Sequence, residues 1–192
     1  SNGTRRKEGK PIALVTGASS GIGAEFCRQL DRQDDITEIW VVARRAERLT
    51  MLAQACEKPV RTFPADLTEE GSLDALAAAL TESDVSIRCL VNSAGYGKLG
   101  AFDRISETDN LGMIELNIMS VVRLTQRALP FMERGGSIFN IASVSAFLPQ
   151  PNFAVYAASK AFILNWSRAL GQERRLREND ITVTAVCPNP IE

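Results

Sequence analysis

The chain of 192 residues contains no histidine. Without an imidazole, a Ser-His-Asp or Cys-His mechanism is excluded, and so is every zinc site that uses histidine as a ligand. The four cysteines, Cys27, Cys56, Cys89 and Cys187, are far apart and form no Cys-x-x-Cys pair. This pattern is typical of reduced, mostly buried thiols and signals neither a metal site nor a disulfide framework.

An excess of charge and long apolar runs are also lacking. The 22 lysines and arginines nearly balance the 23 acidic residues, which leaves a net charge of −1, and no block of like charge indicates a nucleic-acid partner. No apolar run approaches the length of a membrane span. Residues 1–10 lack an apolar signal region and are expected to be a disordered tail or a tag remnant. We therefore expect a soluble, cytoplasmic protein that binds neither nucleic acid nor membranes.

Short apolar runs alternate with helical patterns along the rest of the chain. The runs are rich in β-branched residues and apolar on both faces, which predicts a parallel sheet covered by helices on both sides. Right-handed crossovers favour a doubly wound, Rossmann-like α/β fold of three layers. We expect residues 11–192 to form a single domain of this class, in which Ser72 caps the third helix. The expected strands are 11–16, 38–43, 60–64, 87–92, 137–143 and 181–187, and the expected helices are 22–30, 46–57, 72–80, 106–132 and 152–177.

Tyr156 and Lys160 are four residues apart in the last predicted helix, so their side chains lie one turn apart on the same face. A phenol has an unperturbed pKa near ~10 and holds its proton tightly at neutral pH. A neighbouring ammonium favours the phenolate and lowers that pKa, and the Ser143 hydroxyl can add a hydrogen bond at the same point. This set suits acid–base chemistry. The alternative is a helix that carries an ordinary tyrosine and lysine.

A glycine-rich segment joins the first predicted strand to the first predicted helix. Its glycines permit a tight turn and a close approach of the backbone to a pyrophosphate at the helix N-terminus. The strand–turn–helix context is the one that such a motif requires. The alternative is that the glycines only make the turn. The cofactor-binding residues expected here are Gly17, Ser19, Ser20, Gly21, Ile22 and Gly23.

Arg44 and Arg45 follow the second predicted strand, where an acidic residue would bind the adenosine ribose of NAD. Guanidinium groups suit phosphate through bidentate, charge-assisted hydrogen bonds. The pair therefore predicts NADP(H) in preference to NAD(H), with Arg44 the stronger candidate because it follows the strand directly. The alternative is two solvated arginines at the start of a helix.

Together these segments resemble the short-chain dehydrogenase/reductase family in its compact, non-extended branch. The pattern of that family is a TGxxxGxG turn, an NNAG segment, an asparagine in the fourth helix and a Ser…YxxxK set. Counterparts of all four occur here in the same order, from Thr16 to Lys160. Ser93 is a departure, because the family has asparagine there.

The resemblance implies hydride transfer between NADP(H) and a ketone or secondary alcohol. It assigns Tyr156 as the general acid/base and Ser143 as the hydrogen-bond donor to the substrate oxygen. Lys160 would lower the Tyr156 pKa and bind the nicotinamide ribose. The helix backbone at Asn117 would hold a water on the proton path, although a buried amide also suits a simple packing role.

The resemblance places further cofactor contacts after the third, fourth and sixth strands. Asp66 matches the aspartate that binds the adenine amino group, but it can equally cap the next segment. Asn92 belongs to the NNAG counterpart and can instead pin neighbouring strands. Asn189 stands where the family has glycine. The implied contacts are Asp66, Leu67, Asn92, Ala94, Gly95 and Pro188.

The predicted helices 106–132 and 152–177 are apolar nearly all round. The family forms its dimer interface with these helices, so we expect a homodimer or homotetramer. Burial within one subunit is the alternative. Segment 146–153 should border the substrate pocket as an apolar wall, which suits a steroid, acyl or aromatic ketone, unless its side chains pack under the loop. The chain stops at Glu192, before the seventh strand and the substrate-covering helices that the resemblance implies, and we expect it to lack that region.

Two other functions compete with the reductase. One is a binding module that senses NADP(H) without turnover, which would have no need for Ser143, Tyr156 and Lys160 together. The other is a sugar-nucleotide epimerase or dehydratase of the extended branch. The glycine spacing and the short chain disfavour the latter.

Overall fold

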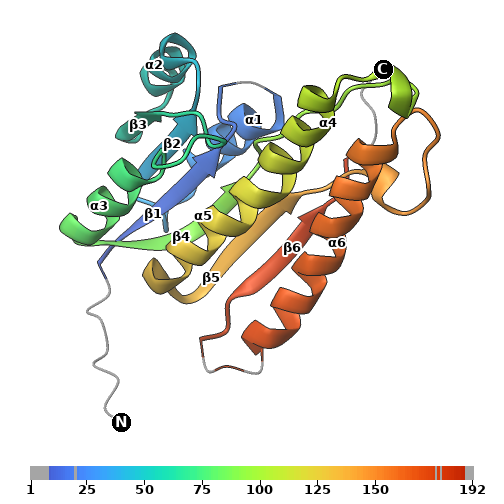
Figure 1. The fold of residues 1–192 in the computed structure, drawn as a ribbon. Helices are drawn as coiled ribbons and strands as arrows, with labels where there is room; N and C mark the ends of the chain where they lie inside the picture. Colours follow the sequence, from blue (N-terminus) through green and yellow to red (C-terminus); the bar gives the residue numbers. More distant parts are fainter. Residues whose placement is uncertain (1–8, 20, 176, 178, 189–192) are drawn as a thin grey trace.

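The structure is a computed structural model that describes residues 9–19, 21–175, 177 and 179–188. Six parallel strands form one sheet in the order β3-β2-β1-β4-β5-β6 (Figure 1). The strand order reverses between β1 and β4, and such a switch point opens a crevice at the carboxyl ends of the strands. The strands are β1 (Lys10–Thr16), β2 (Glu38–Ala43), β3 (Val60–Pro64), β4 (Val85–Asn92), β5 (Met132–Ile141) and β6 (Thr182–Val186).

Helices cover both faces of the sheet, which confirms the predicted three-layer α/β fold (Figure 1). The helices are α1 (Gly21–Leu30), α2 (Ala46–Ala55), α3 (Asp74–Glu82), α4 (Glu107–Ile114), α5 (Ser120–Ala128) and α6 (Ala154–Arg175). Short helical turns are η1 (Phe102–Arg104), η2 (Glu115–Met119), η3 (Leu129–Phe131) and η4 (Val144–Ala146). None of the helices in the described part of the chain is long and apolar enough to cross a membrane.

The alternating side chains of β1 show which helices cover each face of the sheet. Ile12 and Leu14 belong to a core with residues of α3 and α5, whereas Ala13 and Val15 pack with residues of α1 and α2. All four side chains are fully buried, because successive residues of a strand point to opposite faces and both faces are covered.

The predicted elements are present, with three differences of local structure. The predicted helix 106–132 is divided into α4 and α5 by η2, a π-helical turn. β5 begins at Met132 and ends at Ile141, so Ser143 lies two residues beyond it rather than at its end. Ser72 is not a helix cap: α3 begins at Asp74 after Leu73, and no side chain caps it.

A chain of buried polar side chains links β4, β5, α5 and α6. The Asn92 amide donates to Asn140 Oδ1 at 2.8 Å and to Thr125 Oγ1 at 3.0 Å. The Asn140 amide donates to Ser167 Oγ at 3.0 Å, and Ser167 donates to the Ile163 carbonyl at 2.6 Å. Buried polar groups are costly unless they are paired, so this chain fixes the register of these four elements. Asn92 therefore pins neighbouring strands, the role left open by the sequence.

Replacing Asn140 with alanine should lower the free energy of unfolding by about 2–3 kcal/mol, because it leaves a cavity and removes one acceptor and one donor from this chain. Urea denaturation would measure the loss. Thr81→Ala is the matched control, since Thr81 is exposed on α3 and bonds only within its own helix. Equal midpoints for the two variants would contradict the assignment.

Candidate active site

A cleft of about 740 Å³ opens at the carboxyl ends of β1, β2 and β4, where the strand order reverses. It is lined by most of the residues predicted to bind a cofactor. These are Gly17, Ser19, Gly21, Ile22, Gly23, Arg44, Arg45, Asp66, Leu67, Ala94 and Gly95. Asn92, Tyr156, Lys160 and Pro188 are not among its lining residues, and Ser20 and Asn189 lie outside the described residues.

A different physical reason calls for glycine at each glycine position of the turn between β1 and α1. Gly17 has a φ of +62°, and a Cβ there would lie 2.7 Å from the Ala94 nitrogen. A Cβ on Gly23 would lie 2.2 Å from the Gly17 oxygen, so α1 packs directly on the turn. Gly21 has a φ of +58°, and no atom of the described residues, its chain neighbours aside, lies within 4 Å of a Cβ position there. The open space at Gly21 leaves the start of α1 accessible from the cleft, as an anion-binding helix N-terminus requires.

Ser93 holds this turn against β4. Its hydroxyl donates to the Thr16 carbonyl, and its backbone N–H donates to Thr16 Oγ1 at 3.3 Å. A Cβ on Gly23 would lie 2.5 Å from Ser93 Oγ. The small serine therefore suits the narrow space between the two segments, and the departure from asparagine keeps a polar contact there.

Arg44 and Arg45 lie at the end of β2, on the wall of the cleft. Both are exposed, and Arg45 begins α2 without a side-chain cap. Among the described residues, neither guanidinium has a carboxylate partner within 4.0 Å. Two unneutralised cations at the edge of a cleft favour an anionic ligand.

Asp66 follows β3 and has a structural role as well as a place on the cleft. Its Oδ1 accepts hydrogen bonds from the Thr68 backbone at 2.9 Å and the Thr68 hydroxyl at 2.7 Å. These bonds, with the nearby Arg44 charge adding to them, hold the pKa of the Asp66 carboxyl below its ordinary value. Asp66 thus caps the local turn with one oxygen, and the sequence had left that role open.

Asn117 lies in the π-helical turn η2 and is 1% exposed. Its Oδ1 accepts from the Tyr96 N–H at 3.0 Å, and its Nδ2 donates to the Tyr96 carbonyl at 2.9 Å. Nδ2 also donates to Ser159 Oγ at 3.1 Å, and Ser159 donates to the Tyr156 carbonyl at 2.7 Å. One amide therefore ties the segment after β4 to α6. Single π turns are frequent at functional sites.

Lys160 is 6% exposed, and its Nζ donates to the Ile141 carbonyl at 3.0 Å. Burial of the ammonium lowers the pKa of Lys160 to about 8. A Cβ on Gly95 would lie 3.0 Å from Asn117 Oδ1 and 3.3 Å from Lys160 Nζ. Asn117 and Lys160 therefore meet at Gly95, on the edge of the cleft.

The Tyr156 ring is half-buried beside the same ammonium. Lys160 Nζ lies 5.8 Å from the centre of the ring, and the Phe153 ring lies 4.8 Å from it. Ser143 is also half-buried, two residues after the carbonyl that binds Lys160. Its Oγ accepts from the Ser145 N–H at 3.2 Å, so its own hydrogen is available to a third group.

Sequence reasoning missed three residues that shape this site: Tyr96, Gly97 and Gly112. The Tyr96 hydroxyl donates to the Asp109 carbonyl at 3.1 Å, and a Cβ on Gly112 would lie 2.3 Å from that hydroxyl. Glycine inside a helix costs about 1 kcal/mol relative to alanine. Gly112, within α4, was therefore a readable signal of close packing.

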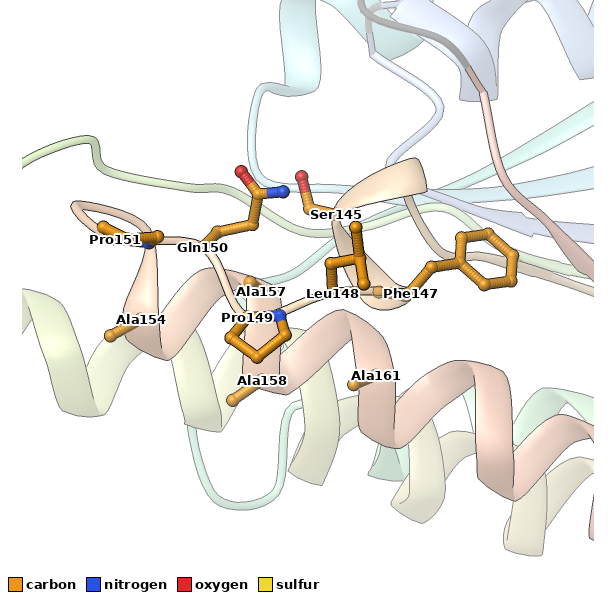
Figure 2. A pocket seen from close by; sticks show the side chains of 11 residues that line it. Ser145, Phe147, Leu148, Pro149, Gln150, Pro151, Ala154, Ala157, Ala158 and Ala161 are labelled. Carbon is orange, nitrogen blue, oxygen red and sulfur yellow. The ribbon is translucent and has the colours of Figure 1, made fainter.

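A second hollow, of about 580 Å³, lies between residues 145–151 and α6 (Figure 2). Phe147 and Leu148 line it and are 56% and 69% exposed. The α6 residues that line it are about 100° or more around the helix axis from Tyr156. These are Ala154, Ala157, Ala158 and Ala161. The expected apolar wall is thus divided: Phe153 lies against Tyr156, whereas Phe147 and Leu148 face a separate groove.

Comparison with known proteins bears on this arrangement. Nodulation protein G of Rhizobium sp. (strain N33) is 38% identical over 182 residues, which are 94% of this chain and 73% of that protein. The bulky-bulky ketone specific alcohol dehydrogenase from Comamonas testosteroni has a similar crystal structure, with a TM-score of 0.82, 35% identity, and coverage of 93% of this chain and 72% of the other. A short-chain dehydrogenase from Sphingobium yanoikuyae in complex with NADPH gives a TM-score of 0.82 at 33% identity, with coverage of 95% and 72%.

A family model described as short chain dehydrogenase matches residues 11–192. The match extends from β1 past β6 and so includes the cleft, the π-helical turn and the Tyr156–Lys160 pair. The protein belongs to the short-chain dehydrogenase family of oxidoreductases.

Proposed function

We propose that the protein is an NADP(H)-dependent reductase or dehydrogenase that transfers a hydride between the nicotinamide and a ketone or secondary alcohol. The observation that carries the proposal is the buried Lys160 ammonium beside the Tyr156 phenol, at the edge of a cleft that begins with a glycine turn. A charge is not buried in this way for packing alone, because desolvation opposes it.

Three features of the cleft fit the proposed cofactor. The space at Gly21 suits a pyrophosphate at the N-terminus of α1. The unneutralised guanidinium groups of Arg44 and Arg45 suit a 2′-phosphate. The Asp66 oxygen that Thr68 leaves free suits an adenine amino group. The NADPH complex of the Sphingobium relative supports the same choice of cofactor.

When bound, the cofactor supplies the hydride, and this chain handles the proton and the orientation. In the reductive direction Tyr156 donates its phenolic proton to the carbonyl oxygen of the substrate. Ser143 donates to the same oxygen, since its contact with the Ser145 N–H occupies an acceptor lone pair and leaves the hydroxyl hydrogen unused. The Lys160 ammonium favours the phenolate that Tyr156 leaves behind. It keeps two N–H donors besides the one given to Ile141, enough for a ribose and a water.

The substrate and the assembly are proposed at a coarser level. The Comamonas relative acts on bulky ketones by its description, and the apolar Phe153 beside Tyr156 favours an apolar carbonyl compound here.

Four apolar side chains of α4, η2 and α6 remain 37–56% exposed: Leu111, Ile114, Met119 and Phe162. Val121 of α5 and Leu164 and Leu170 of α6 are buried within the chain. The exposed set supports a homodimer or homotetramer through these helices.

Tyr156→Phe should reduce kcat by about 10²–10⁴-fold, because it removes the proton donor while leaving the ring. NADPH binding and the unfolding midpoint should be unchanged. The assay is NADPH oxidation across a panel of ketones and diketones, with NADH in parallel. Undiminished turnover in the variant would refute the assignment of Tyr156. NADPH binding without any turnover in the wild type would instead favour a cofactor sensor.

Arg44→Ala should weaken NADPH binding by about 10–100-fold and leave NADH binding nearly unchanged, because a charge-assisted pair with a phosphate is worth about 1.5–3 kcal/mol. Isothermal titration with both nucleotides measures the ratio, with Arg45→Ala compared alongside. Arg134→Ala is the control, since Arg134 is exposed at the opposite end of β5. Equal weakening for both nucleotides in Arg44→Ala would count against a 2′-phosphate contact.

Lys160→Met should abolish turnover and stabilise the cofactor-free protein. A pKa lowered from 10.5 to about 8 means that the folded protein holds this proton less tightly than the unfolded chain. Wild-type stability should therefore gain up to about 3 kcal/mol from this group as pH rises between those two values. The variant has no such group, so its advantage in urea unfolding should be large at pH 7 and small at pH 10. The same difference at both pH values would show that the ammonium is not destabilising.

A further inference from the structure

Gly97, in the segment 95–100 that follows β4, lies directly against the Tyr156 ring. A Cβ built on Gly97 would be 2.6 Å from Tyr156 Cδ2 and 2.9 Å from both Cε2 and Cγ. Real Cβ atoms do not approach ring carbons so closely. The Gly97 backbone therefore occupies the place where any other residue would push the ring.

Space alone accounts for this glycine. The φ of Gly97 does not lie in the left-handed region, in contrast to those of Gly17 and Gly21. Gly97 is also exposed. Alanine would suit its backbone and bury no polar group, so the contact with Tyr156 is what a side chain would disturb.

The segment itself is tied down at several points. Asn117 bonds both the N–H and the carbonyl of Tyr96. The Lys98 ammonium pairs with the Asp109 carboxylate at 2.7 Å, and the Gly100 N–H donates to the Asn152 carbonyl at 2.8 Å. These ties join residues 95–100 to α4, η2 and the turn before α6. If a side chain were added at Gly97, the ring of Tyr156 would therefore yield before the segment did.

We infer that Gly97 is a positioning residue for Tyr156: its bare backbone, anchored through Tyr96, Lys98 and Gly100, sets where the phenol lies relative to Lys160. The ring also touches Phe153, so it is contacted by two elements besides its own helix. The inference rests on the proposed function only in its kinetic consequence. The position of the ring is a property of the folded chain.

The chain contains only two tyrosines, Tyr96 and Tyr156, which permits a direct test. Protein labelled with 3-fluorotyrosine should give two ¹⁹F resonances, which Tyr156→Phe assigns. Gly97→Ala should move the Tyr156 resonance. Gly171→Ala, the same change on the helix that carries Tyr156, should move neither, because a Cβ there meets only ordinary contacts at 3.5 Å.

The kinetic expectation is a fall in kcat of about 10–100-fold in Gly97→Ala, since small displacements of a reacting group are that costly. NADPH affinity should remain that of the wild type. In the Tyr156→Phe background, Gly97→Ala should cause no further loss, because both act through one side chain. If Gly97 had only a structural role, Gly97→Ala would lower the unfolding midpoint and would reduce activity equally in the wild-type and Tyr156→Phe backgrounds.

An unmoved Tyr156 resonance with unchanged kcat would overturn the inference, and so would loss of the folded state in Gly97→Ala. A moved resonance in a protein whose wild type turns over no carbonyl compound would uphold the positioning of the ring and refute the proposed reaction.

Discussion

The Lys160 ammonium lies in the interior and donates to the carbonyl of Ile141, the last residue of β5. An ammonium in such a place loses hydration that one carbonyl only partly replaces. β5, α6 and η2 are joined around it by side-chain hydrogen bonds, which oppose the separation that would admit water. The position of Tyr156, one helical turn away, is a consequence of that burial.

Two polar networks hold these elements, and they lie on the same side of the sheet. The hydrogen bonds from Asn92 through Asn140 to Ser167 hold β4, β5 and α6 together. The side-chain amide of Asn117 holds the segment after β4 against α6. Each network restricts relative motions of these elements that would change the distance between Tyr156 and Lys160. The fold preorganises the site in this way.

The fold could be predicted from the sequence because its central strands β1, β2 and β4 are buried on both faces and read as apolar runs. Prediction failed where the pattern carries no such signal. The start of β5, Glu133 to Gly136, is polar and glycine-rich, and it forms an irregularity between the Ile87–Met132 and Cys89–Ser137 pairs, where Glu133 accepts hydrogen bonds from Arg88 and Ser86. The π turn at Asn117 inserts into a continuous apolar helix, and periodicity cannot show one extra residue per turn.

The site could be predicted as a set of residues but not as a set of contacts. Motif spacing predicted a site at Tyr156, Lys160 and Asn117, which the structure connects through Ser159 and Gly95, and it left open whether Asn92 binds a cofactor or pins strands. The structure places the Asn92 amide among buried partners. The spacing also gave Phe147, Leu148 and Phe153 one common role, whereas a turn before α6 sends them to different sides of the helix.

Residues that matter because they have no side chain give no sign of a chemistry in the sequence. Gly95, Gly97 and Gly112 have no side chain to suggest a chemistry, yet a Cβ on each would meet Lys160, Tyr156 and Tyr96 respectively. The three glycines let the side chains of Lys160, Tyr156 and Tyr96 lie closer to the neighbouring backbone than any other residue at these positions would allow. A site of this kind is defined as much by the backbone that fills it as by the groups that react.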